Sequence, residues 1–343
     1  MIKYKFVAAL LVMYACFGTC NAALAFGEPY SKGHRDSSSE EHLQDLTNIA
    51  SSVDGDSLAT FQEKWVSTEG AELYCRLFGQ GDPIIIIHGA PALTQDYLLP
   101  YLADLSENNL VIFYDQRGCG RSTGKLVDED INVSTFVQDI EAIRKMLNVN
   151  QVTLLGHSWG GFLAMSYTIQ YPTKVDKLIL LDTMPASQDE FTQFIEEVMR
   201  RLAPIHDELQ LLEATELYQS GDPQTIEKQL KMVFQTYFYD PENVNKLHFN
   251  ISGDAFRRGS KVFTLLCNQI FLKPYDIYSD LSKIQSPTLV VHGDADPISY
   301  KMAEHIHQTI PNSQFALIEC CGHFPYAEKP QIMFPVIKKF IRN

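Results

Sequence analysis

The serine at the centre of the segment 156–160, Gly-His-Ser-Trp-Gly, is the first residue of this chain whose setting could support catalysis. The segment has the form G-x-S-x-G and lies between a short apolar run at 152–155 and a stretch with helical spacing at 160–171. A strand, a sharp turn and a helix in that order present a serine hydroxyl at the carboxyl edge of a sheet, close to a helix N-terminus that stabilises developing negative charge. The glycines leave room for such a tight turn. The pattern therefore predicts a nucleophile at Ser158.

A serine hydroxyl is a poor nucleophile until a base takes its proton, so a carboxylate and a histidine are expected further along the chain, in that order. The apolar run at 288–291 leads to Asp294 and Asp296, and the run at 315–318 leads to His323. Each candidate follows a strand at its carboxyl end, where open α/β sheets keep their sites. His323 is predicted to be the general base.

Several other residues compete for these roles. Spacing alone does not decide between Asp294 and Asp296 for the carboxylate that orients the histidine. His88, His157 and His292 each precede a glycine or the nucleophile within a tight turn, so a structural role is predicted for all three.

Acyl transfer also requires two backbone N–H groups that stabilise the oxyanion. Trp159 directly follows the nucleophile and supplies one of them. The isoleucine run at 84–87 ends in His-Gly-Ala-Pro, and the N–H of Ala90 is the predicted second donor because Pro91 has none.

The order of the elements predicts the fold class. Short β-rich runs alternate with helical stretches in 61–184 and again in 283–343, which is typical of a mostly parallel sheet covered by helices. The alternation is interrupted at 185–282, where long amphipathic stretches predict an inserted helical cap. The prediction is one α/β core with a cap.

The first 60 residues follow a different pattern. Two lysines, an apolar run too short to span a bilayer and an Ala-Leu-Ala sequence predict a cleaved signal peptide at 1–25 and hence a secreted or periplasmic protein. The Ser-, Asp- and Glu-rich stretch at 26–60 is predicted to be a mobile leader.

Composition limits the possible partners. A net charge of −14 disfavours binding to nucleic acid and to anionic lipid. We find no nucleotide, flavin or metal motif, and His305 and His307 are two apart on a predicted helix, so they lie on different faces. The sequence therefore predicts no cofactor and a small-molecule or short-peptide substrate, and it leaves the oligomeric state open.

Two motifs carry a resemblance to a known family. The segment 115–122, Asp-Gln-Arg-Gly-Cys-Gly-Arg-Ser, and the tryptophan at 159 are similar to the D-Q-R-G-x-G-x-S and G-x-S-W-G patterns of the α/β-hydrolase superfamily, proline iminopeptidase branch. The resemblance extends from about residue 61 to the C-terminus. It favours Asp296, which stands three residues after the glycine that ends its strand, and it implies release of N-terminal proline or another small apolar residue through an acyl-enzyme.

The sequence departs from the family pattern where specificity is set. The family's H-G-G-P-G is His-Gly-Ala-Pro-Ala here, at 88–92, and the stretch 263–271 lacks a glutamate expected to hold a free α-ammonium group. Glu213 and Glu216, three apart in a predicted helix, are the tentative substrate-binding acids. A carboxylesterase-type hydrolase of small esters or amides is the alternative function, and a non-catalytic binding protein with this fold is a third.

Overall fold

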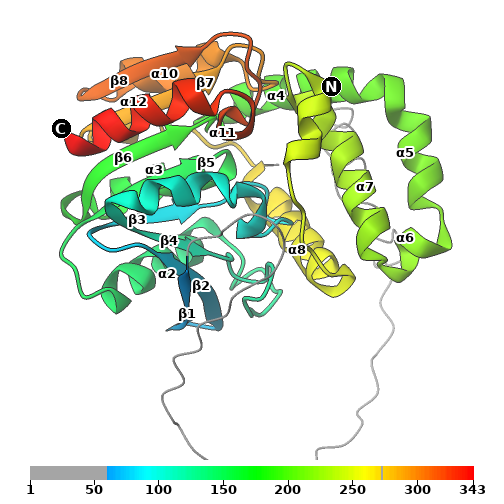
Figure 1. The fold of residues 1–343 in the computed structure, drawn as a ribbon, viewed down its shortest axis with the longest axis horizontal. Helices are drawn as coiled ribbons and strands as arrows, with labels where there is room; N and C mark the ends of the chain where they lie inside the picture. Colours follow the sequence, from blue (N-terminus) through cyan, green and yellow to red (C-terminus); the bar gives the residue numbers. More distant parts are fainter. Residues whose placement is uncertain (1–59, 272) are drawn as a thin grey trace, which may run out of the picture.

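The computed structural model describes residues 60–271 and 273–343, so the predicted signal peptide and nearly all of the predicted leader lie outside the described residues. The centre of the described part is an eight-stranded sheet in the order β1-β2-β4-β3-β5-β6-β7-β8 (Figure 1). Strands β1 and β2 pair antiparallel with each other, β2 pairs antiparallel with β4, and every other pair is parallel. The strands span β1 Phe61–Thr68, β2 Ala71–Phe78, β3 Asp82–Ile87, β4 Asn109–Tyr114, β5 Val152–His157, β6 Val175–Leu181, β7 Thr288–Gly293 and β8 Ser313–Ile318.

Helices cover both faces of the sheet, which explains why its central strands read as unbroken apolar runs. Side chains on one face pack with α12 (Pro330–Arg342) and the short helix η3 (Tyr101–Glu107). Side chains on the opposite face pack with α2 (Val133–Met146), α3 (Trp159–Gln170) and α10 (Tyr300–Thr309). The mostly parallel sheet covered by helices, expected from the alternation of elements, is confirmed.

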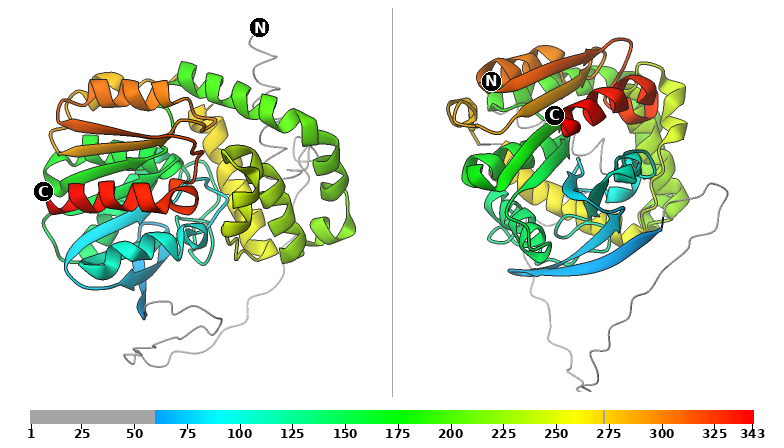
Figure 2. Two further views of the ribbon diagram at one scale, coloured as in Figure 1. Left: turned by 45° about the horizontal axis from the view of Figure 1, so that its top comes forward. Right: turned by 60° about the vertical axis from the view of Figure 1, so that its left-hand side comes forward.

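The chain between β6 and β7 folds into helices that lie beside the carboxyl ends of the strands (Figures 1 and 2). They are α4 Gln188–Leu202, α5 His206–Glu213, α6 Glu216–Ser220, α7 Pro223–Phe234, α8 Gly253–Leu266 and α9 Tyr278–Leu281, with short turns between them. We call this segment, residues 185–282, the cap. None of the helices in the described part of the chain is both long and apolar enough to cross a bilayer.

Candidate active site

Ser158 occupies the sharp turn between β5 and α3. Its backbone has φ 56° and ψ −121°, in the left-handed half of conformational space that non-glycine residues rarely adopt. A side chain at Gly156 would collide with the backbone of Gly160, and one at Gly160 would collide with the carbonyl of Ile87. The strained turn and its two glycines are the features of a nucleophile elbow.

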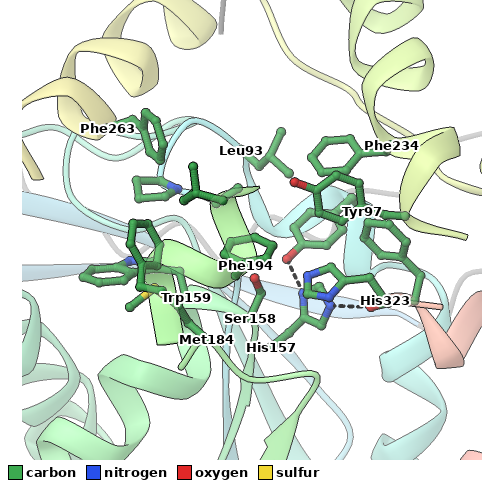
Figure 3. A pocket seen from close by; sticks show the side chains of 16 residues that line it. Leu93, Tyr97, His157, Ser158, Trp159, Met184, Phe194, Phe234, Phe263 and His323 are labelled. Atoms are coloured by element: carbon green, nitrogen blue, oxygen red, sulfur yellow. Dashed lines mark hydrogen bonds between the residues drawn. The ribbon is translucent and has the colours of Figure 1, made fainter. Parts of the chain in front are cut away.

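His323 and Asp296 form a buried pair. The Nδ1 of His323 lies 2.7 Å from Oδ2 of Asp296, and the backbone N–H of Ile298 donates to Oδ1 of Asp296 at 2.7 Å. Burial alone would raise the pKa of Asp296, but the charge of His323 and the hydrogen bonds hold that pKa below its usual value. The carboxylate therefore engages the Nδ1 side of the ring. Ser158 and His323 line the same cavity (Figure 3).

Asp294 lies in the same loop and makes different contacts. Its N–H donates to the carbonyl of Ile318 at 3.0 Å, and its Oδ1 accepts from the N–H of Cys321 at 3.2 Å. These bonds tie the loop after β7 to the loop that carries His323. The structure thus brings Asp296, rather than Asp294, to the histidine.

Ala90 and Trp159 both line the cavity beside Ser158. Ala90 has φ 24°, and its carbonyl accepts from the N–H of Leu93 at 2.8 Å. The N–H of the preceding Gly89 is already used, because it donates to the hydroxyl of Tyr97 at 2.7 Å. The two residues predicted to supply oxyanion donors therefore lie on the same wall as the nucleophile.

The glutamine of the Asp-Gln-Arg block after β4 connects two parts of this site. The indole N–H of Trp159 donates to Oε1 of Gln116 at 3.0 Å, and Nε2 of Gln116 donates to the carbonyl of His88 at 2.6 Å. Arg117 instead forms a buried bidentate ion pair with Asp139 on α2. Gln116, which motif reading did not single out, thus connects the elbow to the loop after β3.

A buried hydrogen-bonded chain connects three parts of the site. The hydroxyl of Tyr97 lies 2.8 Å from Nδ1 of His157, and Nε2 of His157 lies 2.9 Å from the carbonyl of His323 (Figure 3). Burial and the charge of His323 lower the pKa of His157 to about 3, so this ring is neutral. A carbonyl accepts only, so the ring proton is on Nε2 and the tyrosine hydroxyl donates to Nδ1. The chain runs from Gly89 through Tyr97 and His157 to the backbone of His323.

His88 and His292, predicted to be structural, make similar contacts. The Nδ1 of His88 lies 2.7 Å from the carbonyl of Gly89, and Nε2 of His292 lies 2.7 Å from the carbonyl of Ile298. Burial lowers the pKa of His88 to about 4 and also lowers the pKa of His292. Both rings are therefore buried, neutral donors to the backbone.

Replacing Tyr97 by phenylalanine is expected to lower both stability and turnover, because Gly89 and His157 would each lose a buried partner. An unsatisfied buried polar group costs about 1–3 kcal/mol, so two such groups should lower the free energy of unfolding by about 2–6 kcal/mol. Denaturant unfolding and steady-state kinetics measure the two effects. Tyr101→Phe is the matched control, since within the described part of the chain its hydroxyl bonds just the carbonyl of Lys246, at the surface. Equal effects of the two variants would contradict the role of the buried chain.

The cavity in front of Ser158 has a volume of about 90 Å³. Among the described residues that line it, none is aspartate, glutamate, lysine or arginine. The cap contributes mostly apolar side chains to its wall (Figure 3), namely Phe191, Phe194, Ile195, Phe234, Tyr237 and Phe263. The cavity is therefore suited to a small uncharged group.

Glu213 and Glu216 are not among the residues that line the cavity, and the helix predicted to carry both is broken. Glu213 ends α5, and Thr215 caps α6 by accepting from the N–H of Tyr218, so the two acids do not share a helical face. Glu216 is exposed. Glu213 is buried within the cap against Gln229, and burial raises its pKa to about 7. The structure does not bring either acid to Ser158.

Glu328 is a further buried acid that sequence reasoning missed. It accepts hydrogen bonds from the N–H of Gly322 at 2.7 Å and from the N–H of Asp240 at 2.9 Å. The N–H of His323 also donates to the carbonyl of Tyr237 at 2.8 Å. The loop that carries His323 is thus connected directly to the cap by hydrogen bonds.

Comparison with known proteins agrees with this geometry. The family model described as the alpha/beta hydrolase fold matches residues 82–330, and the chain belongs to this family. By sequence it lies in the proline iminopeptidase-like branch. It is 29% identical over 289 residues to the proline iminopeptidase of Saccharolobus solfataricus, a match covering 79% of this chain and 89% of the relative. It is 28% identical over 307 residues to that of Thermoplasma volcanium, covering 83% and 98%.

Solved structures show the same fold. An esterase from Rhodococcus sp. ECU1013 superimposes with a TM-score of 0.63 at 22% identity, over 82% of this chain and 98% of the esterase. The proline iminopeptidase of Mycobacterium smegmatis superimposes with a TM-score of 0.58 at 20% identity, over 82% and 97%. The fold and the sequence relatives together define a hydrolase. Solved structures of an esterase and of a proline iminopeptidase share its architecture.

Proposed function

We propose that this protein is a serine hydrolase that forms an acyl-enzyme on Ser158 and acts on esters or amides whose acyl group is small, apolar and uncharged. The observation that carries the proposal is the buried bond of 2.7 Å between Nδ1 of His323 and Asp296, in a loop that faces the strained elbow of Ser158 across one cavity. This is the relation that a nucleophile, its base and the orienting acid need.

In the proposed reaction Nε2 of His323 takes the proton of Ser158 as Oγ attacks the acyl carbon, and Asp296 holds the Nδ1 proton and stabilises the imidazolium. The N–H groups of Ala90 and Trp159 stabilise the oxyanion. His323 then protonates the leaving group, whose bond to the acyl carbon breaks. Water attacks the acyl-enzyme with His323 again as base, which releases the acid and restores Ser158.

The lining of the cavity supports an uncharged acyl group. A free α-ammonium group placed there would leave water without a carboxylate to pair with it, at a cost of several kcal/mol. The cap acids considered from the sequence do not lie on the cavity wall. Asp296 is already paired with His323, so it is not free to pair with an amine of the substrate.

Proline iminopeptidase activity is the second candidate, favoured by the sequence relatives from Saccharolobus solfataricus and Thermoplasma volcanium, which are proline iminopeptidases. Such an enzyme needs a carboxylate within reach of the substrate's amine. Rearrangement of the cap on substrate binding would be required to supply one.

Two substrates of nearly equal shape separate these functions: proline 4-nitroanilide and cyclopentanecarboxylic acid 4-nitroanilide, which lacks only the amine. We expect the cyclopentane compound to have a kcat/KM at least ~10-fold higher at pH 7, because the prolyl amine is charged. An α-amine titrates near pH 8. The kcat/KM of the prolyl substrate should therefore rise relative to that of the cyclopentane substrate as the pH increases through that range. A clear preference for the prolyl compound at pH 7 would establish the aminopeptidase instead.

A further inference from the structure

Asp182, directly after β6, is a fully buried acid whose side chain lies next to the proposed triad. Its backbone has φ 44°, and its N–H donates to the carbonyl of Val291 at 2.9 Å. The N–H of Gly293 donates to its Oδ1 at 2.9 Å, whereas its Oδ2 is buried with no donor among the described residues. An ionised carboxylate left in this state would be costly.

The side-chain atoms closest to Asp182 are also hydrogen-bond acceptors rather than donors. Asp182, His292 and Asp296 each place a ligand atom within 4.8 Å of the others. Nε2 of His292 donates to the carbonyl of Ile298, so its Nδ1 is bare, and it lies 3.8 Å from Oδ1 of Asp182. Both oxygens of Asp296 already accept hydrogen bonds. The cluster has more acceptors than donors, and a proton on Asp182 supplies one more donor.

The charges around Asp182 favour its neutral form. Burial raises the pKa of Asp182 well above its usual value, the charge of Asp296 raises it further, the N–H of Gly293 lowers it in part, and Glu328 adds to the rise. Cys321, with a pKa raised by burial, and Tyr326 also face this group, and neither brings a positive charge. The pKa of Asp296 is lowered at the same time. Two close carboxyl groups whose pKa values are driven apart hold one proton between them.

A metal ion would be another way to satisfy the same three side chains, which have the composition of a binding site. A cation would have to share the oxygens of Asp296 that accept from His323 and from the N–H of Ile298. Its full charge would compete with the imidazolium of His323 for the carboxylate on which the proposed mechanism depends. A proton fits the cluster without displacing any bond.

We propose that Asp182 is a neutral carboxylic acid that donates a hydrogen bond to the carboxylate of Asp296, and that it acts as a positioning residue for the triad. The inference rests on the proposed function. The bond from Asp182 draws negative charge away from the carboxylate that His323 contacts. It thereby weakens Asp296 as an acceptor as well as fixing the orientation of the acid.

The test compares Asp182→Asn with Asp182→Ala. Asparagine keeps an oxygen for the N–H of Gly293 and replaces the acid hydroxyl by an amide donor, so kcat/KM should stay close to wild type and the acid limb of its pH profile should not move. Alanine removes the donor, so kcat/KM should fall ~10- to 100-fold. Its acid limb should move to higher pH, because Asp296 becomes a stronger acceptor and His323 a stronger base.

The Asp182→Asn variant tests whether Asp182 is protonated even if the alanine variant fails to fold. If Asp182 were ionised, asparagine would remove a negative charge near His323, and the acid limb would move to lower pH, which would overturn the proposal. Infrared difference spectra between wild type and Asp182→Asn provide an independent reading, since the carbonyl band of a protonated carboxyl should be lost in the variant. Absence of that band from the difference would also overturn it.

The pH-dependent rate at which a fluorophosphonate labels Ser158 gives the same profile without knowledge of the substrate. Ser158→Ala is run in parallel. Labelling that persists in Ser158→Ala would defeat the proposed function itself. If labelling depends on Ser158 but the acid limb moves to lower pH in Asp182→Asn, only the inference about Asp182 fails.

Discussion

Ser158→Ala is expected to reduce kcat by about 10⁴- to 10⁶-fold, because the elbow then holds no atom that can form the acyl-enzyme. His323→Ala should give a loss of the same order, since the hydroxyl keeps its proton without a base. The two losses should not add in the double variant, because the residues act as a unit. Steady-state kinetics with 4-nitrophenyl acetate measures all three.

Ser166→Ala is the matched control for this experiment. Ser166 lies on α3, two turns beyond the elbow, and its hydroxyl only bonds the carbonyl of Phe162 in the same helix. It should keep wild-type turnover, and thermal unfolding should show that Ser158→Ala remains folded. Residual turnover above a small fraction of wild type in folded Ser158→Ala would assign the nucleophile elsewhere. A wild-type protein that neither turns over substrate nor reacts with a fluorophosphonate would instead be the binding protein with a retained fold.

The sheet was predictable because local patterns carry it. Four consecutive isoleucines at 84–87 can only be accommodated where both faces of a strand are buried, and all four are buried in β3. The apolar runs predicted as strands at 84–87, 152–155, 288–291 and 315–318 lie within β3, β5, β7 and β8. The positions of Ser158 and His323 follow from the same logic, since each stands beyond a strand's carboxyl end, whereas the choice of Asp296 over Asp294 comes from the family resemblance.

The supporting contacts could not be predicted from such patterns, because they join residues far apart in the chain. Tyr97 meets His157 across 60 positions, and Asp182 meets Gly293 across 111. Nothing in the local sequence around Asp182 marks it as a partner of Asp296, although it also follows a strand. Only the side-by-side order of β6 and β7 brings the two acids together.

The cap was predictable as a helical insert but not in its details. The boundary between α5 and α6 depends on capping rather than on the apolar period. Thr215 is the N-cap of α6 and accepts from the N–H of Tyr218. Because the helix is broken at this point, Glu213 is buried in the interior of the cap and Glu216 is exposed. A threonine between two short apolar periods is a known N-cap signal, and it is the one feature that could have separated the two acids beforehand.

Asp296→Asn is expected to lower kcat by about 10⁴-fold, the second of the large effects. The amide can direct an N–H toward Nδ1 of His323, which would move the ring proton to Nε2. A histidine with that tautomer cannot accept the proton of Ser158. The fold should change little, because asparagine still offers an oxygen to the N–H of Ile298.

Asp294→Asn is the matched control, two positions away in the same loop. Asp294 accepts only from the N–H of Cys321 and does not contact His323, so its variant should lose about 0.5–1.5 kcal/mol of stability at most and keep nearly all of its kcat. Steady-state kinetics and denaturant unfolding on both variants separate an effect on the base from an effect on the loop. The acid would have to be reassigned if Asp294→Asn lost more kcat than Asp296→Asn. Equal small losses in both would mean that His323 does not depend on either carboxylate.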